Sequence, residues 1–247
     1  MGLGTTHIHG LSADELETEL IALRGQLGEL QLPQIAYGRR AIILLEGPQG
    51  AGKKFALKQL AAGFDPCHFT VHSISCDRRQ AAEGHWLARF WRDLPSAGDT
   101  AIFFRSWYRR VLEDRMTGRT DEAAVARAFD EINEFEAQQR DYGTLIVKLY
   151  FEVSAEVQEA RLKERAANQW LSAAAREQPV SVRDEAYLRV VRDLRAHSDM
   201  RWSPWRMIDG DDERLAAMAA LTAVADAWAA AMPTELPHLV GEPTQAA

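Results

Sequence analysis

The chain has 247 residues, of which 47% are hydrophobic and 26% charged, and its formal net charge is −7. These proportions are typical of a globular protein, and the length suits one large α/β domain. The negative charge argues against a general affinity for nucleic acid. Without a long apolar run near the start of the fold or a signal-peptide pattern, we expect a cytoplasmic protein with no membrane segment.

The first predicted element is an amphipathic helix over residues 11–31. Five leucines share its apolar face: Leu16, Leu20, Leu23, Leu27 and Leu30. Ser12 followed by Glu15 predicts a capping box at its start, and Pro33 is expected to follow its end. We assign residues 1–35 to an N-terminal helical extension.

A continuous apolar run over residues 41–45 predicts a strand that is buried on both faces. Residues 47–53 are predicted to form a turn, and residues 53–62 have the composition of a helix. Strand, glycine loop and helix in this order are the start of a βαβ unit. The main domain is therefore expected over residues 36–234.

The rest of the chain alternates strands with helices. Further strands are predicted at residues 69–75, 100–104, 144–153 and 205–208. Helices are predicted at residues 84–94, 106–116, 121–141, 154–165, 184–197 and 211–232. This alternation predicts an α/β fold with a doubly wound, parallel, five-stranded sheet and helices on both faces. Residues 166–183 interrupt the rhythm and are interpreted as a lid, and residues 235–247 as a flexible tail.

Residues 47–53, with the sequence GPQGAGK, match the pattern G-x-x-x-x-G-K of a phosphate-binding loop, or P-loop. Gly47, Gly50 and Gly52 would let the backbone curl so that its N–H groups point at an anion. The helix that begins near Lys53 adds its positive dipole end, and Lys53 supplies a charge that bridges two phosphates. The next residue is Lys54, where a Ser or Thr hydroxyl that helps to bind Mg²⁺ is usual. The loop predicts a site for phosphate groups.

Other cations are expected near this loop. Arg105 and Arg109 follow the third predicted strand, and Arg161 and Arg165 lie on a predicted helix. Because ligands bind at the carboxyl ends of parallel strands, Arg105 and Arg109 are predicted to lie beside the phosphate site. Clustered cations in an acidic protein favour a cleft for a polyanion, and the alternative for each pair is solvated surface charge.

Several strings of residues resemble the family-2 polyphosphate kinases, which transfer phosphoryl groups between polyphosphate and nucleotides. They are EGPQGAGKK from Glu46, RFWRDLP from Arg89, IFFRSWY from Ile102, DEINEFE from Asp130, Gln158 with Arg161 and Arg165, and SPW from Ser203. The similarity runs from about residue 11 to residue 232, and RFWRDLP and DEINEFE look most like the polyphosphate:AMP phosphotransferase branch. It implies a P-loop kinase fold with a helical lid. The implied partners are polyphosphate, a nucleotide (AMP, ADP or GDP), and further copies of the chain or an active paralogue.

The chain departs from this family at two carboxylates. The family's loop carries an aspartate where this chain has Gln49, and its second motif carries a metal-binding aspartate where this chain has Phe104. Phosphoryl transfer depends on cations that neutralise phosphate charge, and hard divalent cations require oxygen ligands. We therefore expect weak or absent catalysis, with Lys53 and Arg105 as the remaining catalytic candidates. Mg²⁺ is expected as a cofactor only if the chain is active, with Glu46 or Asp77 as a substitute ligand.

Three functions remain open at this point. The first is phosphoryl transfer between polyphosphate and a nucleotide. The second is a non-catalytic protein that binds polyphosphate or a nucleotide and acts as a regulatory or partner subunit. The third is a different P-loop kinase of small molecules. A turnover assay separates the first two.

Overall fold

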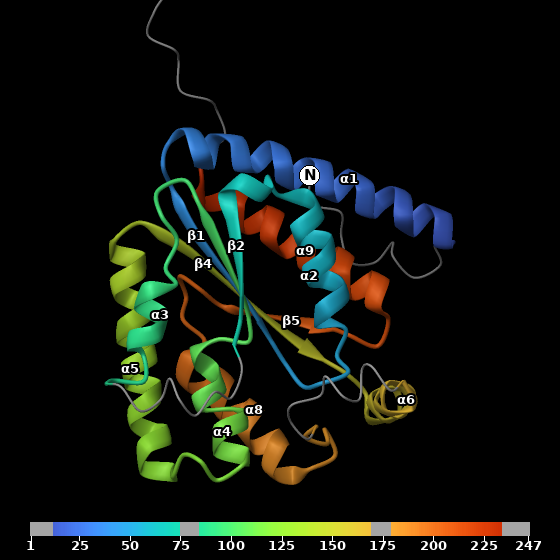
Figure 1. The fold of residues 1–247 in the computed structure, drawn as a ribbon, viewed down its shortest axis with the longest axis vertical. Coiled ribbons are helices and arrows are strands. Elements are labelled where there is room, and N and C mark those ends of the chain that lie inside the picture. The colour runs from blue at the N-terminus through green and yellow to red at the C-terminus, as the bar shows by residue number, and fades with distance from the viewer. Residues whose placement is uncertain (1–11, 75–83, 169–178, 234–247) are drawn as a thin grey trace, which may run out of the picture.

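A fully parallel, five-stranded sheet forms the middle layer of the structure, a computed structural model that describes residues 12–74, 84–168 and 179–233 (Figure 1). The strands are β1 (Arg40–Glu46), β2 (Phe69–Ser73), β3 (Thr100–Phe104), β4 (Thr144–Glu152) and β5 (Trp205–Asp209), in the spatial order β2-β3-β1-β4-β5. In register, Ile43 of β1 lies beside Ile102 of β3 and Val147 of β4. The predicted α/β class is confirmed.

Helices connect the strands and cover both faces of the sheet. They are α1 (Ala13–Ala36), α2 (Lys53–Gly63), α3 (Ala88–Arg92), α4 (Glu113–Met116), α5 (Glu122–Asp141), α6 (Ala155–Ala167), α8 (Glu185–Ser198) and α9 (Glu213–Ala231). Two short 3₁₀ helices, η2 (Pro66–His68) and η4 (Trp107–Arg110), precede β2 and follow β3. Asp77, residues 169–178 of the predicted lid and the predicted tail lie outside the described residues.

The alternation of side chains along β1 produces two hydrophobic cores. Ile43 and Leu45 face one core, which α1, α2 and α9 complete. Ile42 and Leu44 face the other core, to which α3, α5, η4 and α8 contribute. Successive strand residues point to opposite faces, so a strand covered on both sides is apolar throughout, as predicted for this segment. Figure 1 shows the two helical layers on either side of the sheet.

Helix α1 packs along the main domain and continues past the predicted end. Its capping box of Ser12 and Glu15 is present, and the predicted leucine face points into the first core. The prediction that the helix stops before Pro33 is wrong, because it runs to Ala36. A proline in the last turn removes one hydrogen bond. Buried Gln34 holds that turn in place by accepting a hydrogen bond from Trp228 and contacting Thr100.

The helix predicted over residues 106–116 is broken into η4 and α4, and the one predicted over residues 84–94 is reduced to α3. Trp107, Tyr108 and Arg109 are all buried. A helix that packs on one face cannot bury three consecutive side chains, so the chain takes a tighter 3₁₀ turn here. This turn places Arg109 at the carboxyl end of the sheet.

Helix α9 is the one helix in the described part of the chain whose length and composition would suit a membrane span. In the fold it lies between α1, α2 and the sheet, with Ala216, Leu221 and Trp228 fully buried. Its apolar character is explained by this central position in the first core.

Candidate functional site

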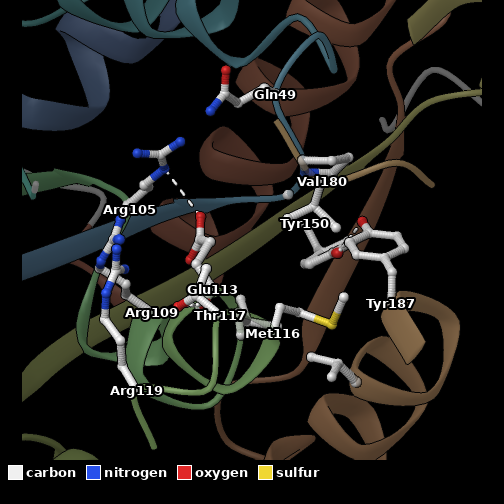
Figure 2. Close-up of a pocket in the computed structure, with 14 residues that line it drawn as sticks. Gln49, Arg105, Arg109, Glu113, Met116, Thr117, Arg119, Tyr150, Val180 and Tyr187 are labelled. Carbon is white, nitrogen blue, oxygen red and sulfur yellow. Dashed lines mark hydrogen bonds and ion pairs between the residues drawn. The ribbon is translucent and has the colours of Figure 1, made fainter. Parts of the chain in front are cut away.

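A cavity of about 310 Å³ opens at the carboxyl end of the sheet, beside the loop that follows β1 (Figure 2). β1 lies between β3 and β4, so the connections on its two sides run to opposite edges, and ligands bind at such a point in open parallel sheets. Residues from the phosphate loop, η4, α4, β4 and α8 line the cavity. They are Gly47, Pro48, Gln49, Arg105, Arg109, Leu112, Glu113, Met116, Thr117, Arg119, Tyr150, Val180, Tyr187 and Val190.

The phosphate loop has the backbone that its sequence predicts. Gly47, Gly50 and Gly52 have φ angles of 127°, 89° and 78°. At Gly47 a side chain is also excluded sterically, because a Cβ there would collide with the carbonyl oxygen of Phe151. Gly52 precedes α2 and no side chain caps this helix. The loop therefore presents an uncapped helix N-terminus, which favours anions.

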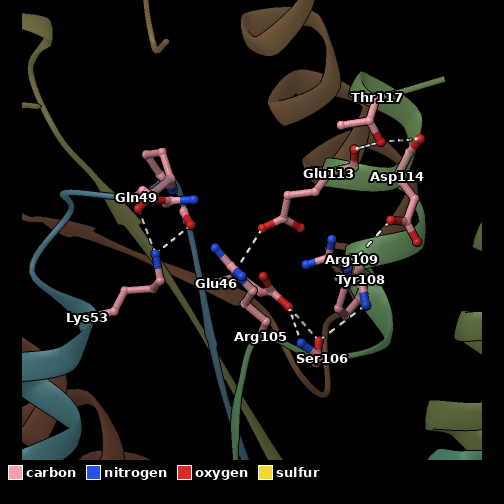
Figure 3. A network of polar contacts seen from close by, with 12 residues as sticks. Glu46, Gln49, Lys53, Arg105, Ser106, Tyr108, Arg109, Glu113, Asp114 and Thr117 are labelled. Carbon is pink, nitrogen blue, oxygen red and sulfur yellow. Dashed lines mark hydrogen bonds and ion pairs between the residues drawn. The ribbon is translucent and has the colours of Figure 1, made fainter. Parts of the chain in front are cut away.

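The side chain of Lys53 is folded back onto the loop. Its ammonium donates hydrogen bonds to the carbonyl oxygens of Gly47 (2.5 Å) and Pro48 (2.7 Å), as Figure 3 shows. It also lies 5.9 Å from the ring centroid of Phe104. Burial, followed by the nearby charge of Arg105, lowers the pKa of Lys53 to about 8. The predicted phosphate-binding lysine is thus cationic at neutral pH and adjoins Gly47 and Pro48, which line the cavity.

Glu46 ends β1 below the cavity and is fully buried. Its Oε1 accepts hydrogen bonds from the backbone N–H and the hydroxyl of Ser106, both at 2.7 Å (Figure 3). Its Oε2 has no hydrogen-bond donor within the described residues. Burial, and next the charge of Glu113, raise the pKa of Glu46 to about 7. The carboxyl group therefore holds its proton to a higher pH than an exposed glutamate does.

Three arginines form the polar side of the cavity, each beside a carboxylate. Arg105 lies 3.1 Å from Glu113, and Asp114 lies 3.5 Å from Arg109 and 3.3 Å from Arg119. The structure brings the predicted Arg105 and Arg109 together with the phosphate loop in one cavity. The sequence did not indicate Glu113, Asp114 or Arg119, because the break between η4 and α4 sets their positions.

Arg105 occupies the turn between β3 and η4 with a φ angle of 62°, the one positive value of a non-glycine residue in the described segments. Its N–H donates to the carbonyl oxygen of Leu45, which keeps the turn against β1. The left-handed conformation is unfavourable for a residue with a Cβ. It directs the next N–H, that of Ser106, onto Glu46.

Arg161, Arg165 and Lys54 do not line the cavity. The Arg161 guanidinium donates to the carbonyl oxygens of Gly50, Gly210 and Asp211, each at 2.7 Å. Arg165 lies 3.5 Å from the side-chain oxygen of Gln49, and Lys54 is exposed on α2. In this arrangement Arg161 stabilises the phosphate loop by donating to backbone carbonyl oxygens.

The described residues do not fit a divalent cation. No group of three His, Cys, Asp or Glu side chains with metal-binding spacing occurs among them. Phe104 places an aromatic ring beside Lys53, and Glu113 faces Arg105. Glu46 offers a single unpaired carboxylate oxygen. Mg²⁺ sites in proteins rely on carboxylate oxygens, and here one carboxylate is paired with Arg105 while the other offers a single oxygen.

The far side of the cavity is largely apolar. Leu112 and Met116 come from the η4–α4 region, and Val190 comes from α8. The hydroxyls of Tyr150 and Tyr187 lie 2.6 Å apart and close this side. Sequence reasoning did not identify these residues, because they are up to 78 positions apart and only the packing of α8 against α4 brings them together. The cavity therefore combines cationic groups with an apolar wall.

The comparisons with known proteins all lead to the same family. The family model described as Polyphosphate kinase 2 matches residues 10–235. A polyphosphate:AMP phosphotransferase of Pseudomonas aeruginosa is 30% identical over 90% of this chain and 45% of its own length. One of Acinetobacter johnsonii is 32% identical over 75% of this chain and 39% of its own length. A solved polyphosphate kinase 2 structure from Pseudomonas aeruginosa has a TM-score of 0.80 and 28% identity, over 90% of this chain and 48% of that one. The chain spans less than half the length of these relatives.

Proposed function

The chain belongs to the polyphosphate kinase 2 family, and we propose that it binds the phosphate groups of polyphosphate or of a nucleotide in the cavity beside its phosphate loop. The observation that carries this proposal is the meeting of the loop, Arg105 and Arg109 in one cavity. Charge-assisted hydrogen bonds from arginine and lysine to phosphate oxygens are among the strong ones in proteins. The uncapped N-terminus of α2 adds to the attraction for an anion.

We further propose that the chain is a poor catalyst or none, and serves as a binding or partner subunit in the cytoplasm. The supporting observation is Phe104, whose ring lies beside the Lys53 ammonium where the end of β3 offers no oxygen ligand. Losing metal-supplied charge stabilisation costs several kcal/mol, or several powers of ten in rate. The partner that we propose for such a subunit is a second copy of the chain or an active paralogue.

The second candidate is an active polyphosphate:nucleotide phosphotransferase. It is favoured by the names of the relatives that match most of this chain at about 30% identity. Activity would require a metal ligand from outside the described residues, such as Asp77. The two candidates share the same ligands and differ only in turnover.

Calorimetry and a turnover assay separate the candidates. We expect tripolyphosphate or ATP to bind without Mg²⁺, with an affinity that falls as salt is added. The Lys53→Ala variant should bind at least about tenfold more weakly, because a charged hydrogen-bond donor is lost. The exposed Lys58 on the same helix provides the matched control, as Lys58→Ala. Absence of binding by the unmodified chain would contradict the first proposal. Robust Mg²⁺-dependent conversion of AMP, ADP or GDP would contradict the second.

A further inference from the structure

The side chain of Gln158, on α6, joins the phosphate loop to the opposite wall of the cavity. It is 1% exposed. Its Nε2 donates to the carbonyl oxygens of Gln49 (2.9 Å) and Val180 (3.0 Å), and its Oε1 accepts from the N–H of Val182 (3.0 Å). Both amide protons and one oxygen lone pair are therefore used on backbone groups of two separate segments.

Neighbouring contacts hold α6 in place for this role. A Cβ at Gly50 would lie 3.3 Å from the Cγ of Gln158, so the loop and the helix are in close contact. Beyond the wall residues, Arg183 pairs with Glu156 at 2.8 Å and with Glu159 at 2.9 Å on α6. Gln158 is thus bound on one side to the loop and on the other to a segment that is itself attached to α6.

The contact with Gln49 bears on phosphate binding through the planar peptide bond. The carbonyl oxygen of Gln49 and the N–H of Gly50 belong to one trans peptide unit and point in opposite directions. When Gln158 holds this oxygen toward α6, the N–H of Gly50 points away from α6. Loops of this kind bind anions through such inward N–H groups.

Gln49 and Val180 both line the cavity, as Figure 2 shows, whereas Gln158 does not. We propose that Gln158 is a positioning residue that couples the wall segment at residues 180–182 to the backbone conformation of the phosphate loop. Phosphate affinity then depends on a side chain that never touches the ligand. The affinity part of this inference rests on the proposed function, and the coupling itself does not.

Two variants and one control test the coupling. Gln158→Met keeps the volume and removes all three hydrogen bonds. Val182→Pro removes the N–H that donates to Gln158 Oε1, and it changes no atom of Gln158 or of the phosphate loop. Gln139 is a second buried glutamine, 5% exposed on α5, so Gln139→Met controls for the loss of a buried amide. Amide hydrogen exchange of residues 47 and 49–52 is measured in ligand-free protein, together with the melting temperature and the tripolyphosphate affinity.

We expect faster exchange of the loop amides in Gln158→Met and, to a smaller extent, in Val182→Pro, but not in Gln139→Met. Tripolyphosphate affinity should fall about tenfold in Gln158→Met, the size expected for hydrogen bonds lost at the loop. Unchanged loop exchange in Val182→Pro, or an equal change in Gln139→Met, would overturn the coupling. If the unmodified chain binds no tripolyphosphate, the proposed function fails, and the exchange data still decide whether Gln158 couples the two segments.

Discussion

Glu46 is an unusual residue in the site, because it is a fully buried carboxyl group with one unpaired oxygen. Burial and the charge of Glu113 raise its pKa from 4.5 to about 7. The folded protein therefore binds more protons than the unfolded chain between these two pH values. By linkage, this group lowers the free energy of unfolding as the pH rises from about 4.5 to about 7, and the penalty then stays constant.

Replacing this carboxyl group by an amide should remove the penalty. In Glu46→Gln the amide oxygen still accepts both hydrogen bonds from Ser106. Above pH 7 the variant should be more stable than the unmodified chain, by up to about 3 kcal/mol, and the two should converge near pH 4.5. Urea unfolding between pH 5 and pH 8 measures this difference. The control is Glu152→Gln, at the exposed end of β4. Parallel pH dependence in Glu46→Gln and the unmodified chain would contradict the assignment.

Gln49 and Phe104 stand where the family resemblance leads us to expect aspartates. Phe104 is partly buried against the first core, so an aspartate there costs a few kcal/mol when no ion compensates it. Gln49→Asp combined with Phe104→Asp should melt at a lower temperature in metal-free buffer. Mg²⁺ with ADP should restore part of the loss, because a ligand that binds only the folded state stabilises it.

The matched control for this pair is Gln49→Asn combined with Phe104→Asn, which has the same shape without the carboxylates. It should lose similar stability and regain none with Mg²⁺ and ADP. Thermal melting of each double variant, in metal-free buffer and with Mg²⁺ and ADP, distinguishes the two. Equal rescue of both would show that the ion does not bind at these positions.

At the scale of elements, the loop between β1 and α2 is held by its neighbours as much as by its own glycines. Gly210, directly after β5, is in close contact with it: a Cβ there would lie 2.5 Å from the carbonyl oxygens of Ala51 and Glu152. Arg161 joins the same two segments through the oxygens of Gly50 and Gly210. The end of β5 therefore helps to fix the shape of the phosphate loop.

Gly210→Ala should displace the phosphate loop. The added methyl group meets backbone atoms that cannot rotate away, so we expect a loss of about 2 kcal/mol or more of stability and weaker tripolyphosphate binding. Gly25→Ala, in the middle of α1, meets nothing within 4 Å and should instead stabilise the protein by roughly 0.5–1 kcal/mol. Urea unfolding and calorimetry of the two variants give the comparison. A Gly210→Ala protein with the same free energy of unfolding as the unmodified chain would show that the backbone at this contact shifts at little cost.

At the scale of the whole molecule, a buried ion pair connects the sheet to the second helical layer. Lys148 of β4 and Glu136 of α5 are both fully buried, with Nζ 3.0 Å from the carboxylate. The same ammonium donates to the Ser198 carbonyl oxygen (2.7 Å) and the Tyr108 hydroxyl (3.2 Å). Trp107 donates to the other oxygen of Glu136 at 2.9 Å. This network ties α5, η4 and the end of α8 together beneath the cavity.

Removing one partner of this pair should cost far more than neutralising both. Lys148→Met leaves a buried charge on Glu136 and should lower the free energy of unfolding by about 3–5 kcal/mol. The double variant Lys148→Met/Glu136→Gln should recover a large part of this loss, since the amide oxygen can still accept from Trp107. Chemical denaturation of both proteins measures the recovery. If the double variant is no more stable than Lys148→Met, the cost arises from packing and not from the unpaired charge.

The features that could be predicted from the sequence depend on residues that lie close together along the chain. Ser12 accepts a backbone hydrogen bond at the start of α1, as its predicted capping box requires, and the helices predicted to begin near Asp121, Ser154 and Asp184 are capped by these residues in the structure. The strand β3 has the predicted bounds, and the phosphate loop has the backbone that its glycines require. These features depend on residues a few positions apart, whose interactions can be read from spacing.

The sequence by itself determined the family and the parallel α/β fold, and it predicted the phosphate loop and the replacement of two aspartates by Gln49 and Phe104. Only the tertiary structure decided that Arg161 serves the loop's carbonyl groups, that Gln158 joins the loop to the wall, and that Lys148 meets Glu136 in the core. Gln158 and Gln49 are 109 positions apart. Which side chains meet over such separations depends on the packing of helices and on strand register, and neither leaves a local pattern in the chain.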